Sequence, residues 1–578
     1  MRHPARIVAL MLLVLCCHRP ASADSDVICT GDCNYDSTVA IDELLTGVAI
    51  TLGHRAIDTC RGFDLDGDGT IGIAELVGGV DNLLRGGCHG ARFVPEDCTV
   101  PLPDGQDPKH ARCGELIVPE DRAAHDGRTL RLAVAVLAAS GPSPASDPIV
   151  FLGGGPGDAV LDGLFQTMTA AFAAPLQTAR DLVFLDQRGA GRSTPSLACP
   201  EWQQAYVDNF TEARSIAEDG QRLVDAMRVC HDRLVSQGVN VAAYTSTAIV
   251  EDITALMPAL GYTQNQQWNL YGFSYGSRVA LTAMRELPRK PHAFSPIRSV
   301  VLDSSVALQA TLEADFAANA ERGLNTLLAA CAGDPGCNAA YPDLEQTLFT
   351  LVDRMNASPV TVHPTDPDGH QLTVVVTGDL FLLGVLGALP NDTLLPFLPA
   401  LIAATAANDR TLLTFAAGVL VGGGDLNAEG MQFSVRCAEG TPFSTPDVIA
   451  AATSGVREEI KRVEVAYETD VFVDICRFWG SPPPAPIENE PVVSSVPTAI
   501  FGGEYDLIQA YGPLAAQTLD HSFYFFFPGQ GHGQIFGHYD PNTPSCGVQI
   551  MAEFFADPTQ APDASCLAAL PLAHFVGS

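Results

Sequence analysis

The segment 268–286, with the sequence WNLYGFSYGSRVALTAMRE, decides the fold of this 578-residue chain. It starts as an apolar strand, turns through a G-x-S-x-G motif centred on Ser274, and continues as a helix. Such a strained turn needs glycine on both sides of the serine, because a side chain at Gly272 or Gly276 would collide with the strand or the helix. The pattern therefore predicts that Ser274 is a nucleophile raised above a sheet.

After residue 98, short β-branched runs alternate with helical stretches, which is typical of an α/β fold with a largely parallel sheet. Eight strands are predicted, at residues 115–118, 130–137, 148–152, 182–186, 268–272, 299–303, 497–502 and 523–527. The serine turn follows the fifth of them. In a fold of this kind, an acid and then a histidine should follow the serine along the chain.

The expected acid and histidine both follow late strands. His532 lies in a glycine-rich loop directly after the strand 523–527, where small neighbours would let an imidazole reach the serine. Asp506 closes the preceding strand, 26 residues before His532, which leaves room for one helix. Glu504 is a local competitor for the role of acid, and the rival histidines are His521, His538 and His574. We expect Ser274, Asp506 and His532 to form a catalytic triad.

A second glycine-rich turn, GGGPGD at residues 153–158, follows the strand at 148–152. Glycines leave backbone N–H groups bare, so the N–H of Gly154 would pair with that of Tyr275 around the negative oxygen formed during attack on a carbonyl. A phosphate-binding loop is excluded by spacing, because neither G-x-x-x-x-G-K nor G-x-G-x-x-G is completed here. Gly154 and Tyr275 are therefore the predicted oxyanion donors.

Together these motifs resemble the α/β-hydrolase superfamily, and more closely its secreted tripeptidyl-aminopeptidase and proline-iminopeptidase branch. The resemblance covers residues 98–570 and rests on GGGPG at 153–157, DQRGAGRS at 186–193, NLYGFSYG at 269–276 and GHG at 531–533. Iminopeptidases typically begin the oxyanion motif with histidine where this chain has Gly153. The resemblance implies an α/β-hydrolase fold with a mainly parallel sheet, and the insertion 306–496 is interpreted as a helical cap over the site.

The resemblance also implies that a cap carboxylate holds the free α-amino group of a peptide substrate. Glu439, in the segment RCAE at 436–439, is the candidate for this role, and the alternative interpretation is a solvated loop glutamate. The predicted function is a secreted serine hydrolase, an aminopeptidase that releases N-terminal residues or short peptides through an acyl-enzyme. Two alternatives stay open: a carboxylic-ester hydrolase with the same triad, and a calcium-dependent attachment protein with an inert hydrolase body. No cofactor is expected for catalysis.

The segment 24–90 carries 12 acidic residues and three arginines, and its acids are regularly spaced. Oxygen-bearing residues stand at positions 1, 3, 5, 7 and 12 of an EF-hand loop, twice, with an offset of 32 residues. The predicted calcium ligands are Asp64, Asp66, Asp68, Thr70 and Glu75 in the second loop and Asp32, Asn34, Asp36, Thr38 and Glu43 in the first. Ser37 replaces the usual turn glycine. The segment resembles a small all-α paired EF-hand or dockerin-type module, which implies Ca²⁺-dependent folding and docking to a protein partner.

Composition and the first residues indicate export. The chain has 32 Lys and Arg against 67 Asp and Glu, a formal net charge of −35, so nucleic acid and anionic membranes are poor partners. Arg2 and Arg6 precede an apolar run too short to span a bilayer, and small residues follow at 21–23, as in a cleaved secretory signal. Sixteen cysteines without a C-x-x-C pair favour disulfides. Spacing suggests the pairs Cys98–Cys113, Cys199–Cys230, Cys331–Cys337, Cys437–Cys476 and Cys546–Cys566.

The predicted domain organisation follows from these segments. A signal peptide at 1–23 precedes a calcium module at 24–92, and the hydrolase core occupies 93–305 and 497–578 with the cap at 306–496 between its two parts. The expected substrates are peptides or small molecules, and the mature protein is expected in a periplasm or outside the cell.

Overall fold

A computed structural model describes residues 30–33, 39–64, 69–84, 91–124, 127–262, 266–289, 296–365, 369–422, 427–537 and 539–577. The chain divides into two compact units, residues 1–92 and 93–578. The predicted signal segment 1–23 lies outside the described residues. Within the described residues, no helix is both long and apolar enough to cross a membrane.

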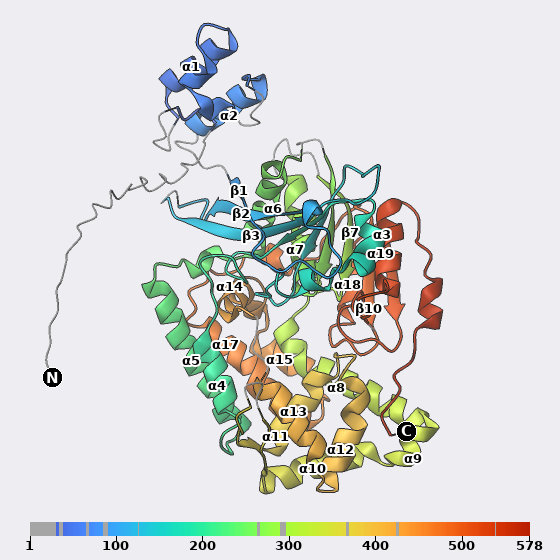
Figure 1. Ribbon diagram of the computed structural model, residues 1–578. Helices are drawn as coiled ribbons and strands as arrows, with labels where there is room; N and C mark the ends of the chain where they lie inside the picture. Colours follow the sequence, from blue (N-terminus) through green and yellow to red (C-terminus); the bar gives the residue numbers. More distant parts are fainter. Residues whose placement is uncertain are drawn as a thin grey trace, which may run out of the picture. The chain divides into compact units, whose positions relative to one another are not determined.

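The second unit is built on a nine-stranded sheet with the strand order β1-β2-β3-β5-β4-β6-β7-β10-β11 (Figure 1). The strands are β1 Arg92–Glu96, β2 Ala111–Pro119, β3 Thr129–Leu137, β4 Ile149–Leu152, β5 Leu182–Leu185, β6 Trp268–Phe273, β7 Ile297–Asp303, β10 Thr498–Gly503 and β11 Ser522–Phe527. β3 pairs antiparallel with β2 and β5, and every pair from β5 to β11 is parallel. All eight predicted strands are present in this sheet, and β1 is the strand of the sheet that sequence patterning missed.

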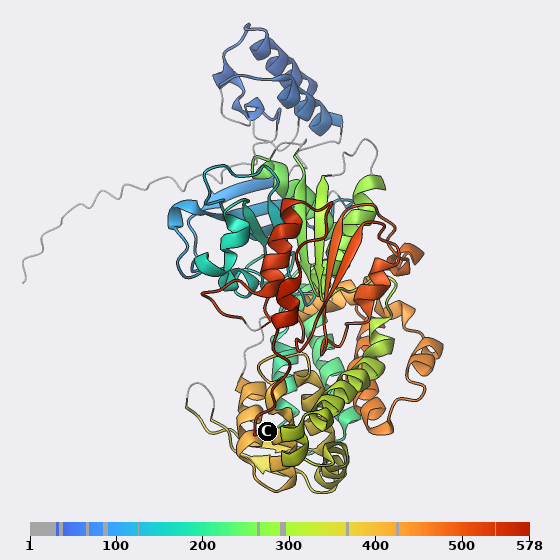
Figure 2. The ribbon, with the colours of Figure 1, turned by 90° about the vertical axis from the view of Figure 1, so that its right-hand side faces the viewer.

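Helices cover both faces of the sheet (Figures 1 and 2). α6 Ser246–Ala259 and α7 Tyr275–Glu286 pack together on one face, and α3 Ala170–Gln177 and α19 Cys546–Ala556 pack together on the other. The strands between these layers are buried on both sides, which explains why β4 and β5 are continuous apolar runs. α18 Tyr511–Ala516 connects β10 to β11, so one short helix separates the strands that precede Asp506 and His532.

The insertion between β7 and β10 is a mainly helical cap that gathers at one end of the sheet (Figure 1). Its helices are α8 Leu312–Gly333, α9 Pro335–Ala340, α10 Leu344–Ala357, α11 Gly378–Ala388, α12 Leu398–Ala406, α13 Thr411–Gly422, α14 Glu429–Glu439, α15 Pro446–Ala452, α16 Glu458–Glu464 and α17 Asp470–Cys476. A short hairpin of β8 Val360–Val362 and β9 Val374–Val376 lies among them. The structure adds two earlier helices to this layer, because α4 Pro200–Asp208 packs on α5 Ile216–Ser236, and α5 packs on α17.

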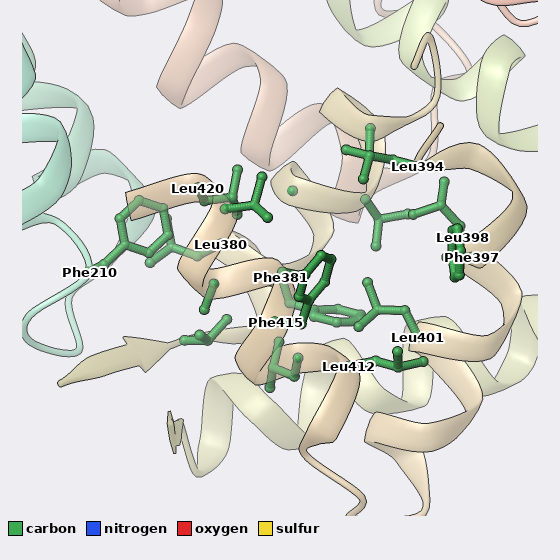
Figure 3. A pocket seen from close by; sticks show the side chains of 18 of the residues that line it. Phe210, Leu380, Phe381, Leu394, Phe397, Leu398, Leu401, Leu412, Phe415 and Leu420 are labelled. Carbon is green, nitrogen blue, oxygen red and sulfur yellow. The ribbon is translucent and has the colours of Figure 1, made fainter. Parts of the chain in front are cut away.

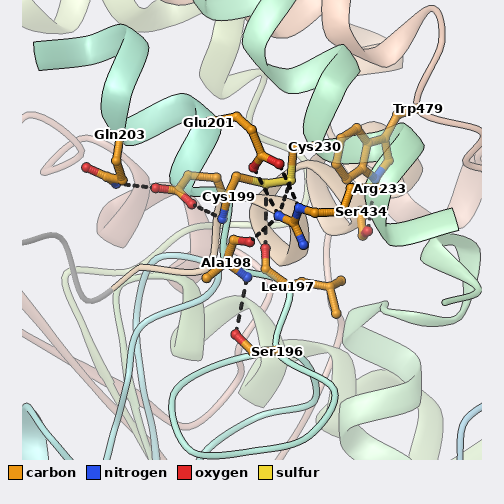
Figure 4. The surroundings of a disulfide bond; sticks show 11 residues. Ser196, Leu197, Ala198, Cys199, Glu201, Gln203, Cys230, Arg233, Ser434 and Trp479 are labelled. Carbon is orange, nitrogen blue, oxygen red and sulfur yellow. Dashed lines mark hydrogen bonds and ion pairs between the residues drawn. A yellow bond between two sulfur atoms is a disulfide. The ribbon is translucent and has the colours of Figure 1, made fainter. Parts of the chain in front are cut away.

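The disulfide Cys199–Cys230 holds the α4–α5 pair together (Figure 4). Beside it, Arg233 of α5 donates to Glu201 of α4 at 2.6 Å. Glu429, at the start of α14, accepts the backbone N–H of Cys199 at 3.0 Å. The α4–α5 segment, which precedes β6 in the chain, is thereby attached to the cap.

All five disulfides suggested by spacing form, and Cys33–Cys60 in the first unit is an additional one. Several disulfides are compatible with an extracellular protein.

The described part of the first unit contains two helices, α1 Ile41–Thr51 and α2 Ile73–Leu84, which pack on each other. Phe63 is fully buried in their small core with Ile50, Cys60 and Ile71. Of the predicted calcium ligands, Asp32, Glu43, Asp64, Thr70 and Glu75 are described, whereas Asn34, Asp36, Thr38, Asp66 and Asp68 lie outside the described residues. The calcium assignment therefore stays a prediction.

Candidate active site

Ser274 occupies the sharp turn between β6 and α7. Its φ of +51° and ψ of −119° are unusual for a residue with a side chain, and this strain is of the kind that functional turns store. A Cβ at Gly272 would meet the backbone of Gly276, and a Cβ at Gly276 would meet the backbone of β4 at Leu152. The two glycines are required because strand and helix approach so closely here, and the serine side chain is left partly exposed.

His532 and Asp506 lie on the loops after β11 and β10. The Nδ1 atom of His532 is 3.0 Å from Oδ1 of Asp506, whose side chain is 1% exposed. Burial lowers the pKa of His532, but the charge of Asp506 and its hydrogen bond outweigh this effect and leave the pKa raised. Glu504 instead accepts the backbone N–H of Gly529 at the start of the histidine loop. Of the two acids, Asp506 is the one in contact with the imidazole.

Ser274 and His532 line the same pocket, and the rings of Phe273 and His532 lie 5.1 Å apart. The predicted oxyanion residues are beside them: a Cβ at Gly154 would lie 3.2 Å from Cβ of Ser274, and Tyr275 follows the serine directly. The structure therefore brings together the five residues that the motifs selected from four separate segments. The rival His521 precedes β11, at the opposite end of that strand, and His538 lies outside the described residues.

Asp303, at the end of β7, is a buried carboxylate that sequence reasoning missed. Its oxygens accept the N–H groups of Gln534 and Ile535 at 2.7 and 3.1 Å and the hydroxyl of Tyr271 at 2.9 Å. Burial raises the pKa of Asp303 to about 6, although the two backbone hydrogen bonds oppose the shift. Asp303 thus fixes the chain that directly follows His532. Its position at the carboxyl end of the strand next to the serine strand was the available signal.

The pocket has a volume of about 260 Å³ and is closed on one side by the cap. Three glutamates and two arginines line it, from α7, α8, α14 and α16. Glu313 binds Nε of Arg436 at 2.9 Å, and Glu439 binds Nε of Arg278 at 3.1 Å. The remaining carboxylate, Glu464, is 7% exposed and receives no hydrogen bond from any described residue. Within this lining, Glu464 is therefore the one carboxyl group that has no arginine partner.

Glu439, the predicted amine anchor, is already fully engaged. Besides Arg278, its oxygens accept the N–H and the hydroxyl of Ser246, each at 2.6 Å. The Ser246 hydroxyl in turn lies 2.9 Å from the hydroxyl of Tyr275. Glu439 thus supports the residue that follows the nucleophile, and its charge is matched by the guanidinium of Arg278.

Glu464 is held in a different way, at the end of α16 where the chain passes into a π-helical turn, residues 465–469. Single π-turns inserted in helices occur often at functional sites, because they redirect side chains. Burial, together with the nearby charge of Glu468, raises the pKa of Glu464 well above its usual range. A buried carboxyl with a strongly shifted pKa in the lining of a pocket is a candidate functional group, and a bound cation would favour its ionised form.

The strand order, the serine turn between β6 and α7, and the acid and histidine loops after β10 and β11 define an α/β-hydrolase fold. In agreement, residues 147–347 match the family model described as the alpha/beta hydrolase fold. The second unit of this chain therefore has the α/β-hydrolase fold.

Individual relatives are distant. YuaR of Escherichia coli (strain K12), which is named as a hydrolase, is 27% identical over 205 residues, or 34% of this chain, and the match spans only 36% of the length of that relative. A proline iminopeptidase from Mycobacterium smegmatis is 16% identical, with 77% of this chain and 98% of that chain covered and a TM-score of 0.35. An esterase from Exiguobacterium antarcticum is 12% identical, with 70% and 90% covered and a TM-score of 0.28.

Proposed function

We propose that this protein is a serine hydrolase in which Ser274 attacks a carbonyl carbon. The observation that carries the proposal is the pocket shared by Ser274 and His532, with His532 hydrogen-bonded to the buried Asp506. His532 takes the proton from the serine hydroxyl, and Asp506 holds the imidazole and stabilises its charged form. The imidazolium then gives the proton to the leaving group, and water hydrolyses the acyl-enzyme by the same steps.

The oxygen of the attacked carbonyl becomes negative in the transition state. The backbone N–H groups of Gly154 and Tyr275 are the proposed donors to it, which the closeness of Gly154 to Ser274 supports. The contacts from Glu439 through Ser246 to the Tyr275 side chain hold the second donor in place. Because these donors are fixed before the reaction, they need no reorganisation when the charge develops.

We further propose that the substrate carries a free α-amino group, which binds Glu464. The other two glutamates of the pocket are paired with arginines, so Glu464 is the carboxylate available to an ammonium group. An ammonium there would lower the pKa of Glu464 and form a charged hydrogen bond in a site with little water. The small pocket volume suits a single residue or a short segment. This favours an aminopeptidase, with Glu464 in the role first assigned to Glu439.

The ester alternative rests on the apolar part of the same pocket. Val306, Ala310, Leu312 and Phe316 line it and would accept an acyl chain as well as an amino-acid side chain. Since both reactions use the same acyl-enzyme chemistry, only the substrate distinguishes them.

The test is a panel of substrates on the purified protein. Aminoacyl and short peptidyl anilides with free amino groups should be cleaved well. The same compounds should be cleaved poorly after N-acetylation. Simple p-nitrophenyl esters should also be cleaved poorly relative to the free aminoacyl compounds. Preference for the esters would select the esterase. Absence of labelling by a fluorophosphonate probe would select the attachment protein with an inert body.

For the first unit we propose two structural calcium ions. Four of the five described donors are carboxylates, the hard oxygen ligands that Ca²⁺ prefers. Glu43 and Glu75, at position 12 of each loop, accept the N–H groups of Ala40 and Gly72 at 2.8 and 2.7 Å, so both are held alike at the start of the helix that follows their loop. Asp64, at position 1, accepts the N–H of Gly69 at position 6. A cleaved export signal and docking of this unit to a protein partner complete the proposal.

A further inference from the structure

The cap contains a second cavity that is separate from the serine pocket. It has a volume of about 410 Å³ and lies among α11, α12 and α13 (Figure 3). No described residue lines both this cavity and the pocket that contains Ser274. A molecule bound here would therefore not be presented to the nucleophile.

The lining of this cavity is almost entirely hydrocarbon. Among the described residues that line it, none is charged, and Thr393 alone carries a polar side chain. Its floor is formed by side chains that are buried, such as Phe381, Val385 and Leu413 at 4% exposure or less. Its rim is exposed, with Phe415 at 66% and Phe397 at 45%. The site is thus a recessed apolar hollow that opens to solvent.

The apolar rim is unusual for the outside of a protein. α13 has the sequence TLLTFAAGVLVG, which is apolar on all sides, and helices of this kind are normally buried. Here Phe415, Val419 and Leu420 are each at least 40% exposed. Contiguous exposed apolar side chains mark interaction sites more often than they serve the fold. Something apolar is therefore expected to cover this part of α13.

We propose that the cavity binds a neutral, lipid-like aliphatic molecule at a site independent of hydrolysis. The volume falls in the range of small-molecule sites, about 300 to 1,000 Å³. An apolar cavity offers water no hydrogen bonds, and such cavities take up hydrocarbons readily. The ligand is neutral because the lining holds no group to match a charge. It is a free molecule rather than a bilayer because the apolar surface is recessed to a buried floor, which a flat membrane surface would not fill.

The experiment measures binding of the neutral dye N-phenyl-1-naphthylamine to the full-length protein by fluorescence, with 1-dodecanol and dodecanoate as competitors. Two variants block the site. Gly384→Leu places a side chain toward Leu420 inside the cavity, because a Cβ at Gly384 would point to within 3.7 Å of that residue. Thr393→Asp adds a charge at an exposed lining position. Gly387→Leu is the matched control, because Gly387 is exposed on the same helix, is not in the lining, and has nothing near its Cβ.

We expect saturable binding of one dye per chain, with dodecanol competing better than dodecanoate. Gly384→Leu and Thr393→Asp should each weaken dye binding by about tenfold or more. Gly387→Leu should bind the dye with the same affinity as the wild type. Labelling of Ser274 by a fluorophosphonate should be the same in all four proteins, which also shows that they are folded. Equal dye binding in all four proteins, or no saturable binding, would overturn the proposal. A third outcome is that the protein floats with phosphatidylcholine vesicles, equally well as wild type and as Gly384→Leu, and shows no saturable dye binding. That result would indicate contact with a bilayer and overturn the proposal.

Discussion

Replacing Glu464 by glutamine should selectively weaken the binding of substrates that carry a free amino group. The substitution keeps the size of the side chain and removes the one carboxyl group of the pocket lining that has no arginine partner and could ionise opposite an ammonium group. A substrate ammonium would then lose its counter-charge, while Ser274, His532 and both oxyanion donors stay in place. The expected effect is on KM, because an interaction with the amino group is present in both the bound substrate and the transition state.

The magnitude follows from the surroundings of Glu464. Two unit charges about 4 Å apart attract by about 4 kcal/mol at an effective dielectric constant near 20. Part of this energy is used to ionise a carboxyl whose pKa burial has raised. The remainder should approach the value of a hydrogen bond between charged groups, about 1.5 to 3 kcal/mol. This corresponds to a rise in KM of roughly 10- to 150-fold.

The assay compares an aminoacyl anilide with its N-acetylated form for wild type, Glu464→Gln and the control variant Glu458→Gln. Glu458 lies on the same helix, α16, but is exposed. KM should rise only when Glu464→Gln is assayed with the free aminoacyl anilide. An equal loss on both substrates would mean that Glu464 supports the fold of the pocket, and no loss on either would mean that the amino group binds elsewhere. Both results would refute the reasoning.

Four further predictions concern the triad, its support and the first unit. Ser274→Ala should lower kcat by about 10⁶-fold without changing the melting temperature, and residual turnover near the wild-type rate would exclude this nucleophile. His532 must be neutral to accept a proton and its pKa is raised, so kcat/KM should fall as the pH drops through a pKa above the usual histidine value near 6.5. Asp506→Asn should shift this acidic fall of kcat/KM to lower pH and reduce kcat by about 10⁴-fold. Glu439→Ala should cost about 3 to 5 kcal/mol in urea unfolding because the buried Arg278 loses its carboxylate counter-charge and keeps only backbone carbonyls as acceptors, whereas Glu439→Gln should cost less. EDTA should lower the melting temperature of the first unit in calorimetry of the whole protein and leave that of the second unit unchanged; an unchanged first transition would contradict the calcium proposal.

The parts of the site that lie next to strand ends could be predicted from the sequence. The turn at Ser274 carries its own signal, since the glycines at 272 and 276 are imposed by contacts with neighbouring backbone. Asp506 and His532 follow from chain order, because consecutive parallel strands bring their carboxyl ends to the same edge of the sheet. The central strands β4, β5 and β10 could be predicted because strands buried on both faces are continuous apolar runs.

The cap could not be predicted at the same level. Helices α11 to α13 are apolar on every side, so periodicity gives neither their packing faces nor the cavity between them. That α4 and α5 join the cap depends on contacts with α17, more than 200 residues away in sequence, and no local pattern encodes them. The pairing of Cys199 with Cys230 was expected, but which layer the paired helices enter was not.

In the proposed function, charge pairing decides between Glu439 and Glu464 as the partner of the substrate amino group. Glu439 stands near the Cys437–Cys476 disulfide and was the plausible anchor by sequence, but Arg278 of α7 reaches it only in the folded protein. Since arginines pair with two of the three glutamates, we infer that the third, Glu464, would gain specificity for an ammonium group from having no arginine partner. A substrate without an amino group would leave the buried Glu464 carboxylate unpaired, which costs binding energy. This penalty exists only while Glu464 is ionised. At low pH Glu464 takes up a proton, so the penalty disappears. The preference for free over acetylated substrates should therefore rise with pH. The rise should end where the substrate amine itself loses its proton, near its usual pKa of about 8. A preference that does not change with pH would mean that the amino group binds a partner other than Glu464.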